Sequence, residues 1–295
     1  MRIVVPERVR SSWELWFDPR QVPELVAATE RRAADAIEAW ELEAIEPLGD
    51  GNVAIVCGCR HGGRPAVLKV TPRMREQTHR RDETDALRVW AGVAPEVLAT
   101  RDDGWTALLE RIEPGVTLKS CSDRLAAMTI LGKVAGRLHR YPPGAGFASL
   151  ADSRAVARWR EYLEDAPDAR AELEDLLATS QDPVLLHLDL HRGNVLRDRT
   201  GWRVIDPKPR LGDRHAECFV FLAHARYLPE RDTAATLEAW IARYATAAQL
   251  DERRMRRWIA VRAEAELGWW PRGEPGWGDD MARLLAALDA HLRGP

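Results

Sequence analysis

The sequence predicts an α+β protein with two lobes: a small, mostly β N-terminal lobe that includes a helix, and a larger, mostly helical C-terminal lobe. The chain has 295 residues, about twice the length of an average domain. Short strand-like segments dominate before Glu113-Pro114-Gly115, and segments of helical periodicity dominate after it. We place the lobes at residues 1–113 and 114–295, the first with an N-terminal helical extension.

The N-terminal lobe should begin with a helix over residues 23–39, because apolar residues recur there at roughly helical spacing. The segments that follow are short, and turn-forming runs such as Gly49-Asp50-Gly51 separate them, which favours antiparallel strands. Strands are expected over 42–48, 53–60, 65–70, 97–100 and 106–110, and a second helix over 75–92.

The C-terminal lobe should be helical with one β interruption. The helices are expected over 123–140, 152–164, 166–179, 214–228, 234–250, 251–269 and 279–292. The interruption, residues 184–205, contains two strand candidates joined by Thr200-Gly201.

Composition and charge exclude several classes of protein. The chain is 45% hydrophobic and 30% charged, which is typical of a globular protein. Its net charge of −3 gives no reason to expect nucleic acid or an anionic membrane as a partner, and no apolar run is long enough to span a bilayer. The scattered cysteines are interpreted as buried thiols, which favours a cytoplasmic location. We expect a monomer or a weak dimer.

The β interruption carries the strongest chemical signal. From His187 to Asn194 it matches the pattern H-x-D-L-x-x-x-N, which is typical of phosphoryl transfer. In that chemistry an alcohol loses a proton as it attacks phosphorus, so Asp189 is the candidate base. Asn194 is a candidate magnesium ligand, and Asp206, at the end of the next strand candidate, is a second.

Each of these residues also fits a purely structural role, as a turn cap or a loop contact. The combination of residue types, order and spacing favours the chemical interpretation. His187 is the exception, because a buried histidine that orients the loop backbone is the simpler interpretation.

The N-terminal lobe offers candidates for nucleotide binding. Lys69 ends a strand that matches V-A-I-K loosely, and a lysine in that place would reach nucleotide phosphates. Glu83 could pair with it, although Glu76, Asp82 and Asp85 compete. Gly49 and Gly51 could let backbone amides approach phosphate, or could simply form a hairpin turn.

The sequence around these residues resembles that of the aminoglycoside phosphotransferases, which are relatives of the protein kinases. The resemblance is strongest to the branch that contains streptomycin 6-phosphotransferases and hydroxyurea-type antibiotic resistance kinases. The resemblance covers about residues 46–217 and is most specific over 187–213, which includes the run I-D-P-K-P-x-x-G-D. It implies a protein-kinase-like fold.

The resemblance also implies a role for each matching residue. Asp189 would be the base, Asn194 and Asp206 would hold Mg²⁺, and Lys69 with Glu83 would bind ATP or GTP. The segment Arg111, Ile112 and Glu113 would offer backbone groups to the purine.

The acceptor site is less well specified by the sequence. At the end of the motif, Asp213 and Glu217 are the predicted substrate contacts, and Arg214 replaces the proline usual in the family. Near the C-terminus, Glu264 and Glu266 lie in a largely apolar helix, so they could bind a cationic acceptor or form internal ion pairs. Trp270, beside them, is a further candidate contact that could stack on a sugar ring or a guanidinium, although tryptophans here could simply pack the end of the lobe. Residues 161–182 are strongly acidic. These acids could attract a cationic acceptor, or they could simply form solvent-exposed helix faces.

The sequence therefore predicts an ATP- and magnesium-dependent kinase that phosphorylates a hydroxyl of an aminoglycoside or aminocyclitol antibiotic such as streptomycin. The expected partner is a small, cationic, polyhydroxylated molecule. The alternatives are a kinase of the same fold that acts on a metabolite, a biosynthetic intermediate or a peptide hydroxyl, and a non-catalytic nucleotide-binding scaffold.

Overall fold

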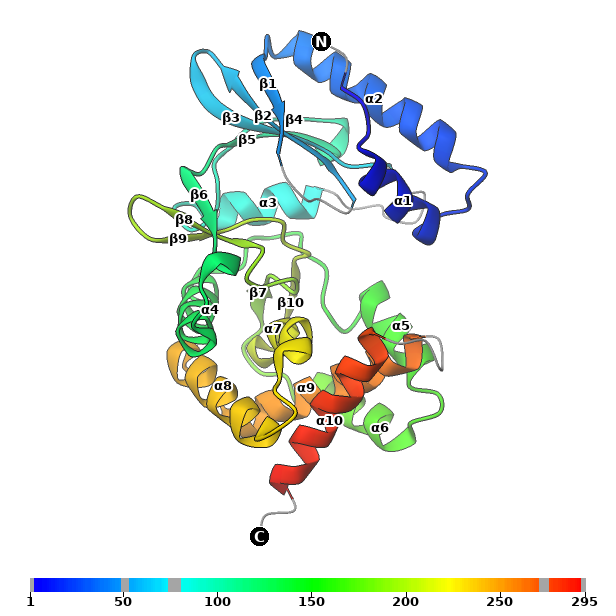
Figure 1. Cartoon of the computed structure of the whole chain (residues 1–295), viewed down its shortest axis with the longest axis vertical. Helices are drawn as coiled ribbons and strands as arrows, with labels where there is room; N and C mark the ends of the chain where they lie inside the picture. The colour runs from blue at the N-terminus through cyan, green and yellow to red at the C-terminus, as the bar shows by residue number, and fades with distance from the viewer. Residues whose placement is uncertain (1–2, 49–52, 74–80, 271–275, 293–295) are drawn as a thin grey trace. The chain divides into compact units, whose positions relative to one another are not determined.

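The computed structural model describes residues 3–48, 53–73, 81–270 and 276–292, and it divides into two compact units, Met1–Gly115 and Val116–Pro295. Figure 1 shows the strands of the first unit and the helices of the second. The predicted combination of a β lobe and a helical lobe is confirmed.

The first unit is a five-stranded antiparallel sheet in the order β1-β2-β3-β5-β4. Its strands are β1 (Glu43–Pro47), β2 (Ile55–His61), β3 (Arg64–Val70), β4 (Val97–Arg101) and β5 (Thr106–Glu110). The predicted strands are therefore present with small shifts at their ends. The central strand β3 pairs with β2 on one side and β5 on the other, and Lys69 lies opposite Val56 and Ala107.

Three helices accompany this sheet: α1 (Glu7–Trp16), α2 (Val22–Ala39) and α3 (Arg81–Val89). The predicted helix over 23–39 corresponds to α2. The prediction that a helix begins near residue 75 falls partly on residues 74–80, which lie outside the described residues. Helix α1 was not predicted as a separate element, because it is only ten residues long and its apolar positions are few.

Helix α2 packs across the sheet and closes the core of the first unit (Figure 1). Its buried Ala33 and Ala36 belong to the same apolar cluster as Leu68 and Leu108 of the central strands. Trp13 of α1 is fully buried in this cluster, and its indole Nε1 donates to the backbone oxygen of Val53 at 2.9 Å.

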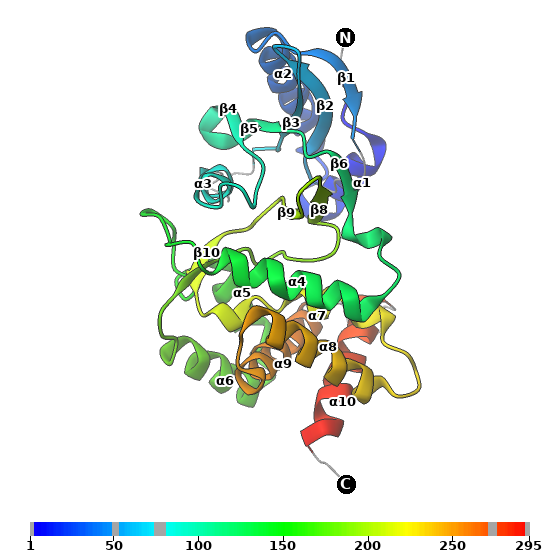
Figure 2. The same cartoon turned by 90° about the vertical axis from the view of Figure 1, so that its left-hand side faces the viewer.

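The second unit is built on long helices, seen from another side in Figure 2. They are α4 (Arg124–Leu138), α5 (Arg154–Tyr162), α6 (Pro167–Ala178), α8 (Thr233–Ala248), α9 (Glu252–Trp269) and α10 (Trp277–Leu292). Asp123, Ser153 and Asp251 cap three of them by accepting a backbone N–H, which satisfies donors that a helix start leaves unpaired.

The predicted helix over 214–228 is wrong, because that segment divides into η3 (Arg214–Ala216), α7 (Phe219–His224) and η4 (Ala225–Tyr227). The break falls at Glu217, whose backbone is not helical. Its buried carboxylate binds backbone N–H groups of a distant loop, and a continuous helix would have to give up that placement.

The β interruption forms two small sheets. Strand β7 (Val184–Leu186) pairs with β10 (Arg210–Gly212), while β6 (Pro114–Thr117), β8 (Val195–Asp198) and β9 (Trp202–Val204) form a sheet in the order β6-β8-β9. The hairpin of β8 and β9 was predicted. Strands β6 and β10 were not, because each is too short to give an alternating pattern.

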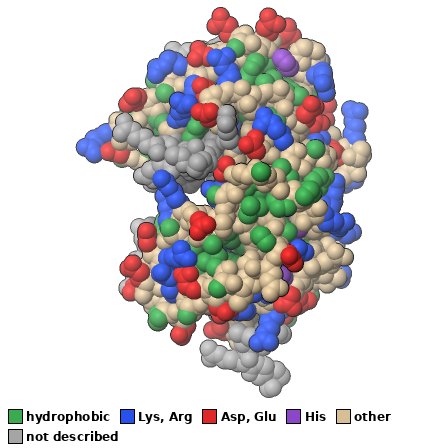
Figure 3. Space-filling view, turned by 180° about the vertical axis from the view of Figure 1, so that it is seen from behind, with side chains coloured by type: hydrophobic (Ala, Val, Ile, Leu, Met, Phe, Trp, Pro, Cys, Tyr) green, Lys and Arg blue, Asp and Glu red, His purple; other side chains and the backbone are tan. Residues whose placement is uncertain are grey.

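Side chains of both charges are interspersed on the face that Figure 3 presents, as the small net charge suggests. Within the part of the chain that the structure describes, none of the helices has the length and apolar character that crossing a lipid bilayer requires.

Candidate active site

The predicted motif lies in a segment whose two ends are joined by one short antiparallel ladder. β7 ends just before His187 and pairs with β10, in which Arg210 lies opposite Leu186. β8 begins directly after Asn194, and β9 ends shortly before Asp206. The predicted polar residues therefore follow or precede strand ends, where the backbone is fixed and a side chain can still meet a ligand.

Glu217 fixes the backbone immediately before Asp189. Its Oε2 accepts the N–H of His187 at 2.6 Å, and its Oε1 accepts the N–H of Leu188 at 2.9 Å. Leu188 has a φ of 59°, a left-handed conformation that costs about 1–2 kcal/mol for an L-residue. Burial raises the pKa of Glu217 to about 7, although these two hydrogen bonds act in the other direction. Glu217 thus stabilises the strained turn that presents Asp189.

Asp189 and Asn194 are linked within the loop. The side-chain Nδ2 of Asn194 donates to the backbone oxygen of Asp189 at 2.9 Å. Because this bond uses the amide nitrogen, the amide oxygen of Asn194 remains available as a ligand. The side chain of Asp189 is 11% exposed, and its Oδ2 lies 3.1 Å from the Nζ of Lys208.

His187 connects this loop to the strand that leads to Asp206. Its Nε2 lies 3.0 Å from the backbone oxygen of Ile205, and its Nδ1 accepts the N–H of Asp189 at 3.3 Å. Burial lowers the pKa of His187 to about 4, so the ring is neutral near pH 7, with the proton on Nε2. This arrangement agrees with the structural role expected of His187.

The donor set of this loop fits Mg²⁺. Asn194 and Asp206 offer an amide oxygen and a partly exposed carboxylate, and Mg²⁺ prefers oxygen ligands. Across the described ranges, no group of three or more His, Cys, Asp or Glu side chains could hold a metal ion. An ion held by Asn194 and Asp206 would therefore complete its coordination with water and nucleotide phosphates, as Mg²⁺ commonly does.

In the first unit, Lys69 of β3 and Glu83 of α3 form a buried ion pair. The Nζ of Lys69 lies 2.5 Å from Oε1 of Glu83, and the two side chains are 11% and 8% exposed. Of the competing acids, Asp85 pairs with Arg88 at 2.7 Å, and Glu76 lies outside the described residues. A lysine held in this way is fixed in direction, as a phosphate-binding cation must be.

For the other residues predicted to bind the nucleotide, the structure gives fewer contacts. Gly49 and Gly51 lie outside the described residues. Arg111 pairs with Glu46 at 2.6 Å. Ile112 and Glu113 follow the end of β5, so their backbone groups stand outside the ladder of the five-stranded sheet.

The family model described as aminoglycoside/hydroxyurea antibiotic resistance kinase matches residues 39–273. The chain belongs to this family. The predicted resemblance is therefore confirmed, and so is the prediction of a phosphotransferase that acts on a hydroxyl group.

Two relatives show how similar this chain is to other members of the family. It is 33% identical to a streptomycin 6-kinase of Streptomyces glaucescens over 233 residues, which cover 72% of each chain. It is 34% identical to a hydroxyurea phosphotransferase of Kitasatospora aureofaciens over 209 residues, which cover 64% of this chain and 59% of that one.

Solved structures agree with the kinase-like fold. The aminoglycoside phosphotransferase APH(4)-Ia, in a ternary complex with ADP and hygromycin B, superposes with a TM-score of 0.59 at 18% identity, covering 88% of this kinase and 97% of that chain. Choline kinase LicA from Streptococcus pneumoniae gives the same TM-score at 17% identity, with 88% and 98% covered. At these identities the likeness concerns the fold alone.

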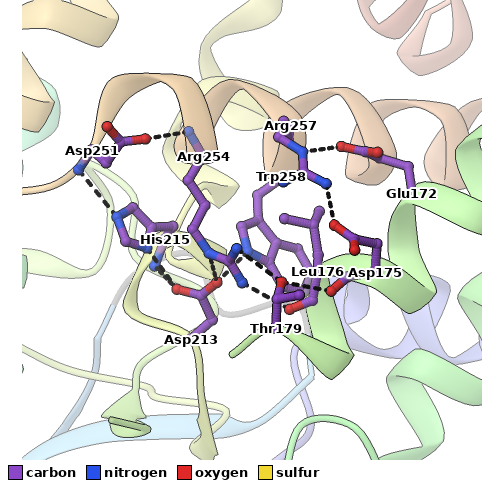
Figure 4. A network of polar contacts seen from close by, with 10 residues as sticks. All are labelled: Glu172, Asp175, Leu176, Thr179, Asp213, His215, Asp251, Arg254, Arg257 and Trp258. Atoms are coloured by element: carbon purple, nitrogen blue, oxygen red, sulfur yellow. Dashed lines mark hydrogen bonds and ion pairs between the residues drawn. The ribbon is translucent and has the colours of Figure 1, made fainter. Parts of the chain in front are cut away.

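Asp213, one of the predicted substrate contacts, lies in a buried network of polar contacts (Figure 4). Its carboxylate accepts hydrogen bonds from His215 at 2.6 Å, Arg254 at 2.5 Å and Trp258 at 2.9 Å. Burial would raise the pKa of Asp213, but these bonds outweigh it and hold the pKa well below its usual range. Asp213 thus ties the end of β10 to α9. Like Glu217, it has partners within the chain that sequence reasoning did not foresee.

The C-terminal candidates differ from one another. Glu266 accepts from Arg262 at 3.1 Å and from the indole of Trp277 at 3.2 Å, so its carboxylate is already paired. Glu264 is half-buried, and burial together with the charge of Asp289 raises its pKa.

Trp270 packs within the second unit. Its ring meets Trp269 edge to face, with the centroids 5.7 Å apart. A Cβ placed on Gly278 would come within 2.7 Å of the Trp270 ring, so this ring lies against the start of α10. These contacts agree with the packing interpretation of the tryptophans.

The acidic stretch over 161–182 is partly neutralised. Arg257 of α9 binds both Glu172 and Asp175 (Figure 4). Glu174 pairs with Arg160 at 2.8 Å and with Arg170 at 3.1 Å. Three of the acids are therefore used to join helices rather than to attract a ligand.

Two residues near Asp189 were not singled out from the sequence. Arg192 lies inside the motif, and its guanidinium donates to the backbone oxygens of Leu118, Lys119 and Cys121, which anchors the loop. Lys208 contacts the carboxylate of Asp189 directly. The I-D-P-K-P run contained the only signal for Lys208, and that signal did not indicate which way its side chain points.

Proposed function

We propose that this resistance kinase transfers the γ-phosphoryl group of ATP, with Mg²⁺, to a hydroxyl of a cationic, polyhydroxylated antibiotic of the streptomycin type. The observation that carries the proposal is the loop from His187 to Asn194, in which Glu217 and Asn194 hold Asp189 in a fixed, largely buried position with 11% of its side chain exposed. A catalytically inactive scaffold would have no use for that arrangement.

Each residue then has a definite task. Asp189 accepts the proton of the acceptor hydroxyl as that oxygen attacks the γ-phosphorus. Lys69, oriented by Glu83, binds the nucleotide phosphates. Asn194 and Asp206 would hold Mg²⁺, which when bound neutralises charge on the phosphates.

Two observations support a cationic acceptor: the similarity to a streptomycin 6-kinase and the environment of the Glu264 carboxylate. A streptomycin 6-kinase is 33% identical to this chain. Within the second unit, burial and the neighbouring charge of Asp289 raise the pKa of the half-buried Glu264, and a cationic ligand beside Glu264 would favour its charged form.

Hydroxyurea is the second candidate acceptor, because a hydroxyurea phosphotransferase is 34% identical to this chain over 209 residues. It is small and uncharged, so it would not need Glu264. The two candidates therefore differ in their dependence on that residue.

The test is a transfer assay with labelled ATP on streptomycin, hydroxyurea and a neutral sugar, using the parent chain and Asp189→Asn. The asparagine keeps the shape of the side chain but cannot accept a proton, so we expect turnover to fall by about 10²–10⁴-fold with ATP binding retained. Asp152→Asn, an exposed acid before α5, is the matched control.

Labelled product with streptomycin alone supports the proposal, and product with hydroxyurea alone supports the second candidate. Transfer to neither acceptor, or an Asp189→Asn rate within threefold of the parent, contradicts the proposal.

A further inference from the structure

Lys208 is an exposed lysine whose ammonium lies against the candidate catalytic base. Its side chain is 69% exposed, yet its Nζ is 3.1 Å from Oδ2 of Asp189. Its backbone N–H donates to the oxygen of His187 at 2.9 Å, and prolines stand on both sides of it. The backbone of Lys208 is therefore fixed next to the catalytic loop, while its long side chain can move.

The use of lysine at this place is unusual for the chain, which contains four lysines and 39 arginines. Arginine forms planar, bidentate contacts, whereas an ammonium is a compact charge with three rotatable donors and no acceptor. On a flexible side chain, such a group can pass from a carboxylate oxygen to a nearby phosphoryl oxygen by a change of rotamer. Lys69 of β3 likewise contacts a carboxylate, that of Glu83.

Phosphoryl transfer creates a need for such a cation. In the transition state, negative charge spreads over the three equatorial oxygens of the transferring group, close to the base. Asp189 and Asp206 both act electrostatically on the ring of His191, so two carboxylates lie in this part of the site. Mg²⁺ held by Asp206 would offset that carboxylate, whereas Asp189 would still repel an incoming phosphoryl group, and a local cation would relieve that repulsion. Arg192 cannot supply it, because three backbone oxygens already hold its guanidinium.

We propose that Lys208 is a further catalytic residue, whose ammonium turns from Asp189 to the transferring phosphoryl group and neutralises its charge. This inference rests on the proposed kinase function. In the step, the hydroxyl proton of the acceptor passes to Asp189 and the acceptor oxygen bonds to the γ-phosphorus. The bond from that phosphorus to the bridging oxygen breaks, and its electron pair leaves on ADP. Lys208 remains protonated throughout.

The test uses the full chain with Lys208→Met, Lys208→Arg and the control Lys133→Met, an exposed lysine on α4. Two rates are measured, transfer to streptomycin and hydrolysis of ATP without acceptor. Because hydrolysis needs the same charge neutralisation with water as the nucleophile, it reports on Lys208 whatever the true acceptor is.

We expect Lys208→Met to lower kcat of both reactions by about 10²–10³-fold, as loss of one donor to a transition-state oxyanion does. The KM for the acceptor and the melting temperature should not change, because the side chain is exposed. Lys208→Arg should recover part of the rate, since it restores the charge without the compact geometry.

A second measurement excludes an indirect effect. Lys208→Cys, in a chain that also carries Cys121→Ser, can be alkylated with 2-bromoethylamine, which rebuilds an ammonium of similar length. The remaining cysteines are buried. Recovery of kcat after alkylation supports the proposal.

Three results would overturn the proposal: kcat of Lys208→Met within threefold of the parent, a loss confined to transfer while hydrolysis is unchanged, or no recovery on alkylation. A parent chain that transfers phosphate to no acceptor and hydrolyses no ATP would instead contradict the kinase function itself.

Discussion

At the scale of single residues, Asn194 and Asp206 differ from Asp189 in what their loss should change. Each is a proposed oxygen ligand of Mg²⁺ rather than a proton acceptor. We expect Asn194→Ala and Asp206→Ala each to raise the magnesium concentration required for half-maximal turnover, which a titration of initial rates would measure.

Asn194→Ala should have a second effect, because it also removes the hydrogen bond to the backbone of Asp189. Its maximal rate at saturating magnesium should therefore stay below that of the parent. Magnesium dependence that is unchanged in both variants would remove the two residues as ligands.

Glu266 should stabilise the fold rather than bind the acceptor, because its carboxylate pairs with a buried arginine. The side chain of its partner Arg262 is only 8% exposed and stacks on Trp159 at 4.0 Å, so neutralising Glu266 leaves a buried guanidinium with a weaker partner. We expect Glu266→Gln to lower the free energy of unfolding by about 1.5–3 kcal/mol, typical for a hydrogen bond to a charged group. Urea unfolding would measure this loss.

Glu264→Gln is the matched comparison, two residues earlier on α9 and without an ion pair among the described residues. It should change the acceptor KM while leaving stability largely intact, because its carboxylate is destabilised by burial rather than stabilised by a partner. The opposite pattern, with stability lost at Glu264 and acceptor affinity lost at Glu266, would reverse the assignment.

At the scale of elements, the close contact between α4 and α8 depends on a glycine, Gly132, which has no side chain to keep the two helices apart. A Cβ on Gly132 of α4 would lie 2.5 Å from the backbone oxygen of Tyr244 and 2.9 Å from Cβ of Ala247, both on α8. The two helices touch along their backbones at this point, so an added methyl group must push them apart.

We expect Gly132→Ala to destabilise the protein by about 1–3 kcal/mol, the usual cost of overpacking, even though alanine favours helix formation. Gly201, in the turn between β8 and β9, has no atom within 4 Å of its would-be Cβ and is the control. Thermal unfolding of both alanine variants would decide the matter, and equal melting temperatures would show that the helices separate freely.

At the scale of the whole molecule, buried neutral histidines should limit stability in acid. Burial, with the nearby charges of Arg214 and His215, lowers the pKa of His139 to about 3, and burial lowers that of His224 to about 4. Neither ring nitrogen of His139 has a hydrogen-bond partner among the described residues. The unfolded chain binds these protons near pH 6.5, so stability is complete above that pH and declines as pH falls toward the folded values.

For His139 alone, the loss at pH 5 should be about 2 kcal/mol relative to neutral pH, since one pKa unit corresponds to about 1.4 kcal/mol. We expect His139→Phe to keep the stability of the parent near neutral pH and to lose less of it at pH 5. Urea unfolding at both pH values would show the difference, and parallel losses in the two proteins would argue against this origin of acid sensitivity.

The sequence by itself determined the kinase-like fold and the family, together with the candidate base and metal ligands. It could do so because the chemistry requires residue types at fixed short spacings, as between His187, Asp189 and Asn194. Local patterning also predicted most helices and strands, since apolar periodicity is a property of each segment alone.

Only the tertiary structure decided which distant groups support that loop. Glu217 and Lys208 reach the segment around Asp189 from outside the motif, and Glu217 breaks an otherwise helical segment to do so. Asp213 was predicted as a substrate contact, but Arg254 of α9, 41 residues along the chain, pairs with it. A contact between residues far apart in the chain depends on how the elements pack, and no local spacing records it.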